Sequence, residues 1–277
     1  MVKKLFRYEL KSYSRSLMPM QLILFCIALL TRLIWIFESD NVAFTIFGNS
    51  AVIAFVIACI VCCVMTFVLI IRRFYKNLYS PEGYLSFTLP VNCHQHICAK
   101  LLAAMVLTVG TALALVLSIC VATCGELTVE LFKAAGYLLN RIFREVSVFP
   151  VLLAILAGLL FIADTYLLFY ACITIGQKAK KNRVLAAAGV YFAWYLIRQL
   201  LGTILLFLFV GVEWKEAAPR FYDFVYTNAV RFVEWGDAHV AGFFSIIFGA
   251  ICLVEILVGL LYYFVTHRVM SRKLNLE

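Results

Sequence analysis

Residues 44–90 read FTIFGNSAVIAFVIACIVCCVMTFVLIIRRFYKNLYSPEGYLSFTLP, and two kinds of sequence meet in them. The run 44–71 is predominantly apolar and is longer than the roughly 20 residues that an α-helix needs to cross a bilayer. The residues that follow are basic and contain signals for a short helix outside the membrane. Together they predict a membrane-spanning helix that ends in a polar loop, residues 72–100.

The loop carries the signals of its own short helix, between Ser80 and Pro90. The Ser80 hydroxyl can cap the helix, and Pro81 fits the first helical position, where no amide hydrogen is needed. Glu82 lies in the first turn, where the helix dipole favours a negative charge, and Pro90 ends the helix. Because a helix of this length is not stable alone in water, we expect it to lie against the membrane or a partner. An inert connecting turn is the alternative.

The composition of the chain is that of an integral membrane protein. Of its 277 residues, 65% are hydrophobic and 14% are charged, and the mean hydropathy is +0.98, which soluble domains do not approach. The sequence therefore predicts an all-α fold in which residues 17–277 form a single transmembrane domain of six helices. The predicted spans are residues 17–37, 44–71, 101–123, 150–175, 184–212 and 240–265.

The distribution of lysine and arginine predicts the orientation of these spans. The N-terminal segment, the loops 72–100 and 176–183 and the tail after residue 265 carry sixteen of them, whereas the two long loops carry six. Because cytoplasmic loops are enriched in basic residues, we expect both termini and the 80–90 helix in the cytoplasm. The net charge of +9 then reflects topology and anionic lipid, without a nucleic-acid partner.

The two long loops, residues 124–149 and 213–239, face outward in this topology. Leucines recur at helical spacing in the first, and aromatic residues alternate with charged ones in the second. Such aromatic density is typical of the headgroup level or of a re-entrant segment shielded by protein. We therefore expect interfacial or re-entrant helices on the outer side.

Residues 1–16 predict an amphipathic helix that lies in the membrane interface. Basic residues recur at every fourth position from Lys3 to Arg15, and apolar side chains cover the opposite face. Pro19 then permits a bend into the first span. That span is too long for the core of a signal peptide, and we expect it to remain as an anchor. A disordered basic tail is the alternative for residues 1–16.

Four ionisable residues lie within the predicted spans, namely Arg32, Asp164, Arg198 and Glu255. Charges at membrane depth are costly and usually face the bundle interior or water, paired with one another. The depths of the last three agree to about one helical turn, so an Asp164–Arg198 or Arg198–Glu255 pair is possible. Arg32 is nearer the outer end and can extend toward the interface. These residues either pair helix to helix or line a polar conduit or proton relay.

Signatures of catalysis and metal binding are weak or missing. The sequence has no G-x-x-x-x-G-K-[ST] loop, no H-E-x-x-H and no G-x-S-x-G, so we expect no enzyme and no cofactor on this chain. Cys93, His94, His96 and Cys98 have the chemistry of zinc ligands, but on a helix His94 and Cys98 share a face while His96 points elsewhere, and we expect no metal site. Most of the ten cysteines lie in spans, and no disulfide framework is evident.

A basic N-terminal helix, six spans and the segment EGYLSFTLP after the second span resemble the permease subunits of the second ABC exporter family. The resemblance covers the whole chain in topology and residues 72–100 in motif. It is strongest to small Firmicutes-type members that work with a separately encoded ATPase. In that family the loop after the second span supplies a coupling helix that docks on the nucleotide-binding subunit. The residues that the resemblance assigns to this contact are Glu82, Tyr84, Leu85 and Phe87.

The resemblance also implies a complex of two permeases, identical or paralogous, with two ATPases in the bacterial cytoplasmic membrane. ATP and Mg²⁺ would bind to the partner ATPase, and residues 213–239 would match the family's re-entrant helices. The exported substrate would be hydrophobic or amphipathic: a peptide toxin, antimicrobial peptide, drug or lipid; some small members export phenol-soluble modulins. A proton-coupled secondary transporter that uses Asp164, Arg198 and Glu255 is the alternative, and a non-transporting scaffold is a third hypothesis.

Overall fold

Helices are the only regular secondary structure in the part of the chain that the structure describes, which confirms the all-α prediction. Six of them are long and apolar enough to cross a membrane, in agreement with the six predicted spans. The structure is a computed structural model that describes residues 2–37, 42–79, 83, 92–123, 129–130, 132–137, 140, 148–179, 182–207 and 219–272.

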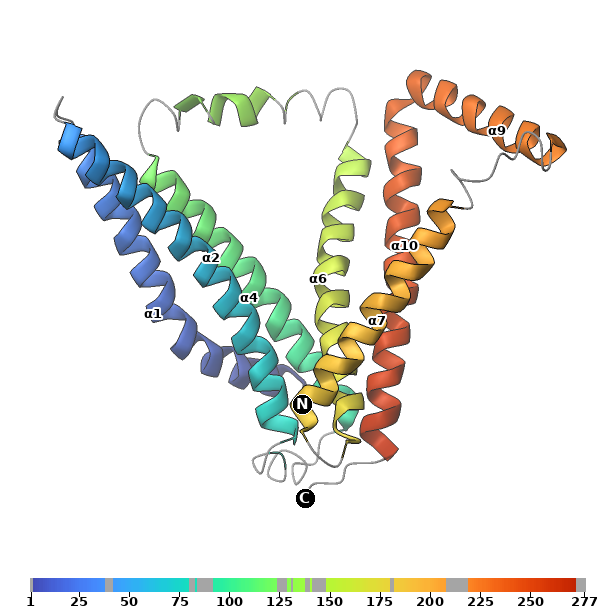
Figure 1. The fold of residues 1–277 in the computed structure, drawn as a ribbon, viewed down its shortest axis with the longest axis horizontal. Helices are drawn as coiled ribbons and strands as arrows, with labels where there is room; N and C mark the ends of the chain where they lie inside the picture. The colour runs from blue at the N-terminus through green and yellow to red at the C-terminus, as the bar shows by residue number, and fades with distance from the viewer. Residues whose placement is uncertain are drawn as a thin grey trace. The chain divides into compact units, whose positions relative to one another are not determined.

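Seven of the described helices, the six long apolar ones and α9, follow one another along the chain (Figure 1). They are α1 (Val2–Ile36), α2 (Val42–Tyr79), α4 (Cys93–Ala122), α6 (Val148–Gly176), α7 (Arg183–Leu206), α9 (Pro219–Ala238) and α10 (Val240–Arg272). Several helices continue past the predicted spans into basic sequence, because lysine and arginine are good helix formers once a helix has begun. The last residues of the predicted span 184–212 lie outside the described residues.

The predicted N-terminal helix and the first span are one helix, α1. Pro19 lies inside it, and its ribbon changes direction between the N-terminal part and the long remainder (Figure 1). A proline has no amide hydrogen and its ring crowds the preceding turn, which bends a helix. The basic side chains of residues 3–15 are exposed, whereas Tyr13 and Leu17 are buried. That residues 1–16 lie in the membrane interface stays a prediction.

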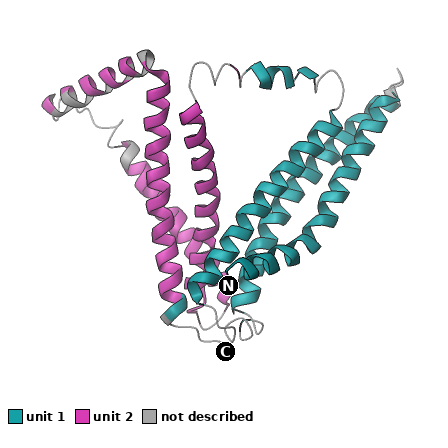
Figure 2. Cartoon of the chain, turned by 180° about the vertical axis from the view of Figure 1, so that it is seen from behind, with its two compact units in different colours: residues 1–139, 270–277 teal, residues 140–269 magenta. Residues whose placement is uncertain are grey.

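The chain divides into two compact units, which Figure 2 colours separately. The first comprises residues 1–139 and 270–277, and its helices α1, α2 and α4 pack against one another. Its core includes Ala28, which has no accessible surface. Small residues at such crossings let helix backbones approach closely, which is how helices associate where lipid removes the hydrophobic driving force.

The second unit comprises residues 140–269 and is built on α6, α7 and most of α10. α6 packs along α7, and at Gly176 a Cβ would lie 2.6 Å from the Cα of Ala187. Only glycine leaves room for so close an approach of two backbones. α10 is joined to α7 by a hydrogen bond in which Trp194 Nε1 donates to the Tyr262 hydroxyl at 3.0 Å.

Both long loops predicted on the outer side contain helix, in residues 132–137 of the first and in α9 of the second. Aromatic rings hold the corner between α9 and α10. Trp235 and His239 stack with 5.4 Å between ring centroids, and Phe232 lies 5.1 Å from Phe243. The corner is therefore a packed junction, and the interfacial or re-entrant position of α9 stays a prediction.

Candidate functional site

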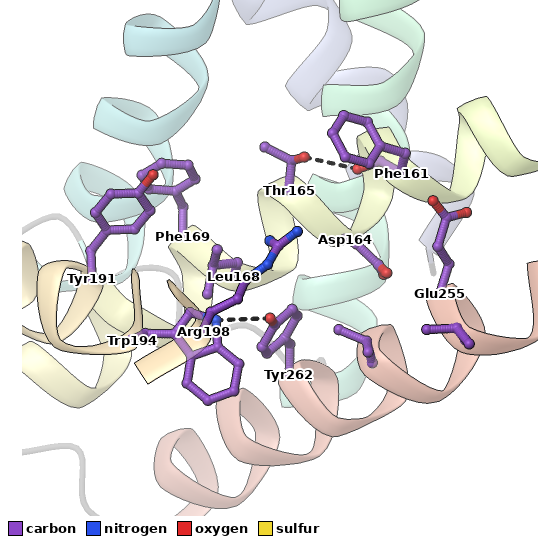
Figure 3. A pocket seen from close by; sticks show the side chains of 12 residues that line it. Phe161, Asp164, Thr165, Leu168, Phe169, Tyr191, Trp194, Arg198, Glu255 and Tyr262 are labelled. Carbon is purple, nitrogen blue, oxygen red and sulfur yellow. Dashed lines mark hydrogen bonds between the residues drawn. The ribbon is translucent and has the colours of Figure 1, made fainter. Parts of the chain in front are cut away.

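A pocket of about 450 Å³ lies among α6, α7 and α10 in the second unit. Its size falls in the range of about 300–1,000 Å³ that is typical of small-molecule sites. It brings together three ionisable residues and five aromatic ones among apolar side chains (Figure 3). The lining residues are Phe161, Asp164, Thr165, Leu168, Phe169, Tyr191, Trp194, Arg198, Val254, Glu255, Val258 and Tyr262.

Each of the three helices contributes one ionisable group to the pocket: Asp164 from α6, Arg198 from α7 and Glu255 from α10. Among the described residues none of the three forms an ion pair within 4.0 Å, and Oε2 of Glu255 is buried without a hydrogen-bond partner. The predicted Asp164–Arg198 or Arg198–Glu255 pair is therefore not formed. Charged groups that line a cavity without pairing fit a polar conduit better than helix-to-helix ion pairs.

Asp164 lies directly against the backbone of α10. A Cβ added to Gly259 would collide with the carboxylate oxygen Oδ1 of Asp164. Because glycine has no side chain, the carboxylate occupies the space that a larger residue would fill. Gly259 thus positions Asp164 in the pocket, although it carries no functional group itself.

Aromatic rings in fixed orientations form part of the pocket wall. Phe169 and Tyr191 stack with 5.0 Å between their centroids. Trp194 meets Tyr262 edge to face at 5.8 Å, in addition to the hydrogen bond between them. Such rings offer an apolar surface and an electron-rich face at the same time. The pocket can therefore bind a ligand that is partly apolar and partly charged.

The other predicted site residues are not part of this pocket. Arg32 belongs to α1 in the first unit. Between the predicted docking residues, Gly83 is described, and a Cβ there would lie 2.6 Å from the carbonyl oxygen of Leu78. The predicted docking residues themselves lie outside the described part of the chain, and they are Glu82, Tyr84, Leu85 and Phe87.

A second charged cluster, absent from the predicted sites, lies in the first unit. Glu9 of α1 accepts a hydrogen bond from Lys100 Nζ at 2.7 Å and from Arg73 Nε at 2.8 Å. Asn77 Nδ2 also donates to Glu9 at 3.4 Å, and the Arg73 guanidinium lies 4.6 Å from the ring centre of Tyr13. The side chain of Glu9 is 4% exposed and that of Lys100 is 2% exposed. Glu9, Arg73 and Lys100 are called the Glu9 cluster below.

The Glu9 cluster holds both ends of the predicted docking loop, residues 72–100, beside the N-terminal part of α1. The N-terminal segment and the two ends of the loop are therefore on the same side of the first unit, in agreement with the charge distribution. That this side is the cytoplasm stays a prediction. The sequence feature that could have indicated this cluster is the position of Glu9. It falls in one helical stripe with Tyr13 and Leu17, on the face that is buried.

The cysteines and histidines at the start of α4 do not converge as ligands would. Cys98 Sγ lies 3.6 Å from Nδ1 of His94, one helical turn earlier, whereas His96 is buried. Within the described residues no three potential ligands come together.

Comparisons with known proteins identify no relative of this chain. No family model, no curated protein and no solved structure matches it. The features that bear on its function are the pocket in the second unit, the Glu9 cluster and the sequence of the 72–100 loop.

Proposed function

We propose that this chain is the permease subunit of an ABC exporter for a hydrophobic or amphipathic substrate. The observation that supports transport is the pocket in which Asp164, Arg198 and Glu255 meet among membrane-spanning helices. Ionisable residues at membrane depth are expensive and mark ion or substrate pathways. A scaffold that only anchored other proteins would gain nothing from three such groups that form no ion pair in the described part of the chain.

The proposed energy source is ATP hydrolysis by a separate ATPase that docks on residues 80–90. The capped-helix signals of this segment and its resemblance to a coupling helix support the assignment. The Glu9 cluster adds a route for coupling, because the ends of the loop are joined to α1 by two short ion pairs, of which Lys100–Glu9 is buried and Arg73–Glu9 is partly buried. A movement imposed on the loop would then be passed to α1, α2 and α4. A second permease copy or paralogue would complete the complex.

Copurification and transport test the exporter proposal. The chain is coexpressed with an ATPase encoded beside it, purified in mild detergent and reconstituted into liposomes. We expect the ATPase to remain bound, its ATP hydrolysis to rise in the presence of the permease, and an amphipathic peptide to move only when ATP is present. Transport that proceeds equally without ATP would contradict the proposal.

A proton-coupled secondary transporter is the second candidate function. The specific observation in its favour is that the Asp164 and Glu255 side chains, both lining the pocket, form no ion pair among the described residues. Carboxyl groups of this kind carry protons in pumps and transporters. Under this hypothesis an imposed proton gradient would drive transport in liposomes that contain no ATPase, and Asp164→Asn or Glu255→Gln would abolish it.

A further inference from the structure

The charges of the pocket are unequal. Asp164 and Glu255 present two carboxylates, and Arg198 presents one guanidinium (Figure 3). Even if Arg198 neutralises one carboxylate, the second remains without a cation among the described residues. A carboxylate withdrawn from water is stabilised by a positive partner and destabilised by an apolar or anionic one. The pocket can therefore accommodate one further positive charge.

The aromatic wall favours the same kind of ligand. The faces of tryptophan and tyrosine attract a cation that lies within about 6 Å of the ring centre. Trp194 and Tyr262 are held in fixed orientation by their hydrogen bond, and Tyr191 is held by stacking on Phe169. These rings therefore offer electron-rich surface without further ordering of the side chains. They also provide apolar surface for the part of a ligand next to its charge.

We propose that this pocket binds an organic cation, an ammonium group attached to an apolar or aromatic body, as the recognised part of the substrate. The proposal rests on the transport function above and specifies its substrate class. The volume of about 450 Å³ holds one head group or one cationic side chain with its apolar neighbour, and excludes a folded peptide. A cationic amphiphile would place its charged group here and its tail toward the lipid.

Binding is measured on the full chain in nanodiscs of neutral phosphatidylcholine, without an ATPase. Trp194 lines the pocket and becomes the only fluorescent tryptophan when the other three, Trp35, Trp214 and Trp235, are replaced by phenylalanine. The probes are benzyltrimethylammonium and benzenesulfonate, which have similar sizes and opposite charges. We expect saturable quenching of Trp194 by the ammonium compound and none by the sulfonate.

Removing a carboxylate and removing the arginine should change the affinity for the ammonium compound in opposite directions. Asp164→Asn and Glu255→Gln should each weaken ammonium binding by at least about tenfold, the scale of one desolvated cation contact. Arg198→Gln removes the competing cation and should strengthen ammonium binding. A loss of binding in all three variants, or tighter binding of the sulfonate, would overturn the proposal.

Two glycines of α10 supply a matched pair of variants that keep every charge. Gly259→Ala forces the Asp164 carboxylate to move and should weaken binding, whereas Gly249→Ala meets no atom within 4 Å and should not. Equal affinities in both variants would contradict the assigned role of Asp164. Because no ATPase is present, the result is independent of the exporter proposal: a chain that binds the cation but retains no ATPase contradicts only that proposal, and a chain that retains the ATPase but binds no cation contradicts only this one.

Discussion

The carboxylate of Glu9 pairs with two cations of the first unit. It lies between Lys100 Nζ at 2.7 Å and Arg73 Nε at 2.8 Å, and Lys100 is almost fully buried. The buried Lys100 ammonium is tolerable only while the carboxylate beside it is charged and paired, whereas the Arg73 side chain is 21% exposed. The cluster therefore stabilises one arrangement of α1, α2 and α4 and penalises others.

Glu9→Gln should destabilise the protein by about 3–5 kcal/mol, the usual result of removing one partner of a buried ion pair. Thermal unfolding of the purified protein in detergent measures the effect. Glu9→Gln combined with Lys100→Met should be less destabilising than the sum of the single changes, because the second substitution removes the stranded charge.

Lys11→Gln is the matched control for this experiment, since Lys11 lies in the same segment and is exposed. It should leave the unfolding temperature unchanged. If the destabilisation of the double variant equals the sum of the two single destabilisations, Glu9 and Lys100 are not coupled in the folded protein.

At the scale of elements, the crossing of α6 and α7 depends on the absence of a side chain at Gly176. Gly176→Ala would place a methyl group 2.6 Å from the backbone of Ala187. We expect a loss of about 1–3 kcal/mol of stability, the usual range for overpacking, measured by thermal unfolding. Gly189→Ala in α7 meets nothing within 4 Å and is the control; equal melting of the two variants would contradict the close crossing.

The coupling proposal depends on the predicted helix of residues 80–90. Tyr84→Ala and Phe87→Ala should each weaken association with the ATPase by about 1–2 kcal/mol, because large exposed anchors dominate such contacts. Copurification and stimulated ATP hydrolysis should fall together, while membrane insertion is unchanged.

Tyr137→Ala is the control for the docking variants, because this exposed tyrosine is predicted on the outer side. It should retain the ATPase. If the Tyr84→Ala, Phe87→Ala double variant also retains its ATPase and transports normally, the loop is only a connection between α2 and α4.

At the scale of the whole molecule, the topology is the prediction that decides the rest. On a background without the ten native cysteines, Tyr137→Cys should react with an impermeant thiol reagent in intact cells. Tyr84→Cys should react only after the cells are permeabilised, because basic loops are retained in the cytoplasm. Labelling of position 84 from outside would contradict the predicted topology and remove the basis of the coupling proposal.

The number and approximate position of the spanning helices could be predicted from the sequence because they are local properties. A run of about 20 apolar residues satisfies the backbone as a helix wherever it lies in the bilayer. Helix in the first long loop could be predicted from the spacing of its leucines, whereas the aromatic density of the second indicated an interfacial or re-entrant segment. The continuation of α2 to Tyr79 could not be predicted, because hydropathy marks the end of the apolar run and not the end of the helix.

The sequence alone thus determined an all-helical chain with six membrane-length helices, and it identified Asp164, Arg198 and Glu255 as unusual at membrane depth. Only the tertiary structure decided that these three line one pocket and form no ion pair with any described residue, and that Glu9 meets Arg73 and Lys100. Glu9 and Lys100 are 91 positions apart in the chain. Contacts over such separations depend on how each helix is rotated about its own axis and on where a glycine such as Gly259 lets another side chain approach. Hydrophobicity and helix propensity do not specify that rotation; the packing of small residues and the pairing of buried charges do.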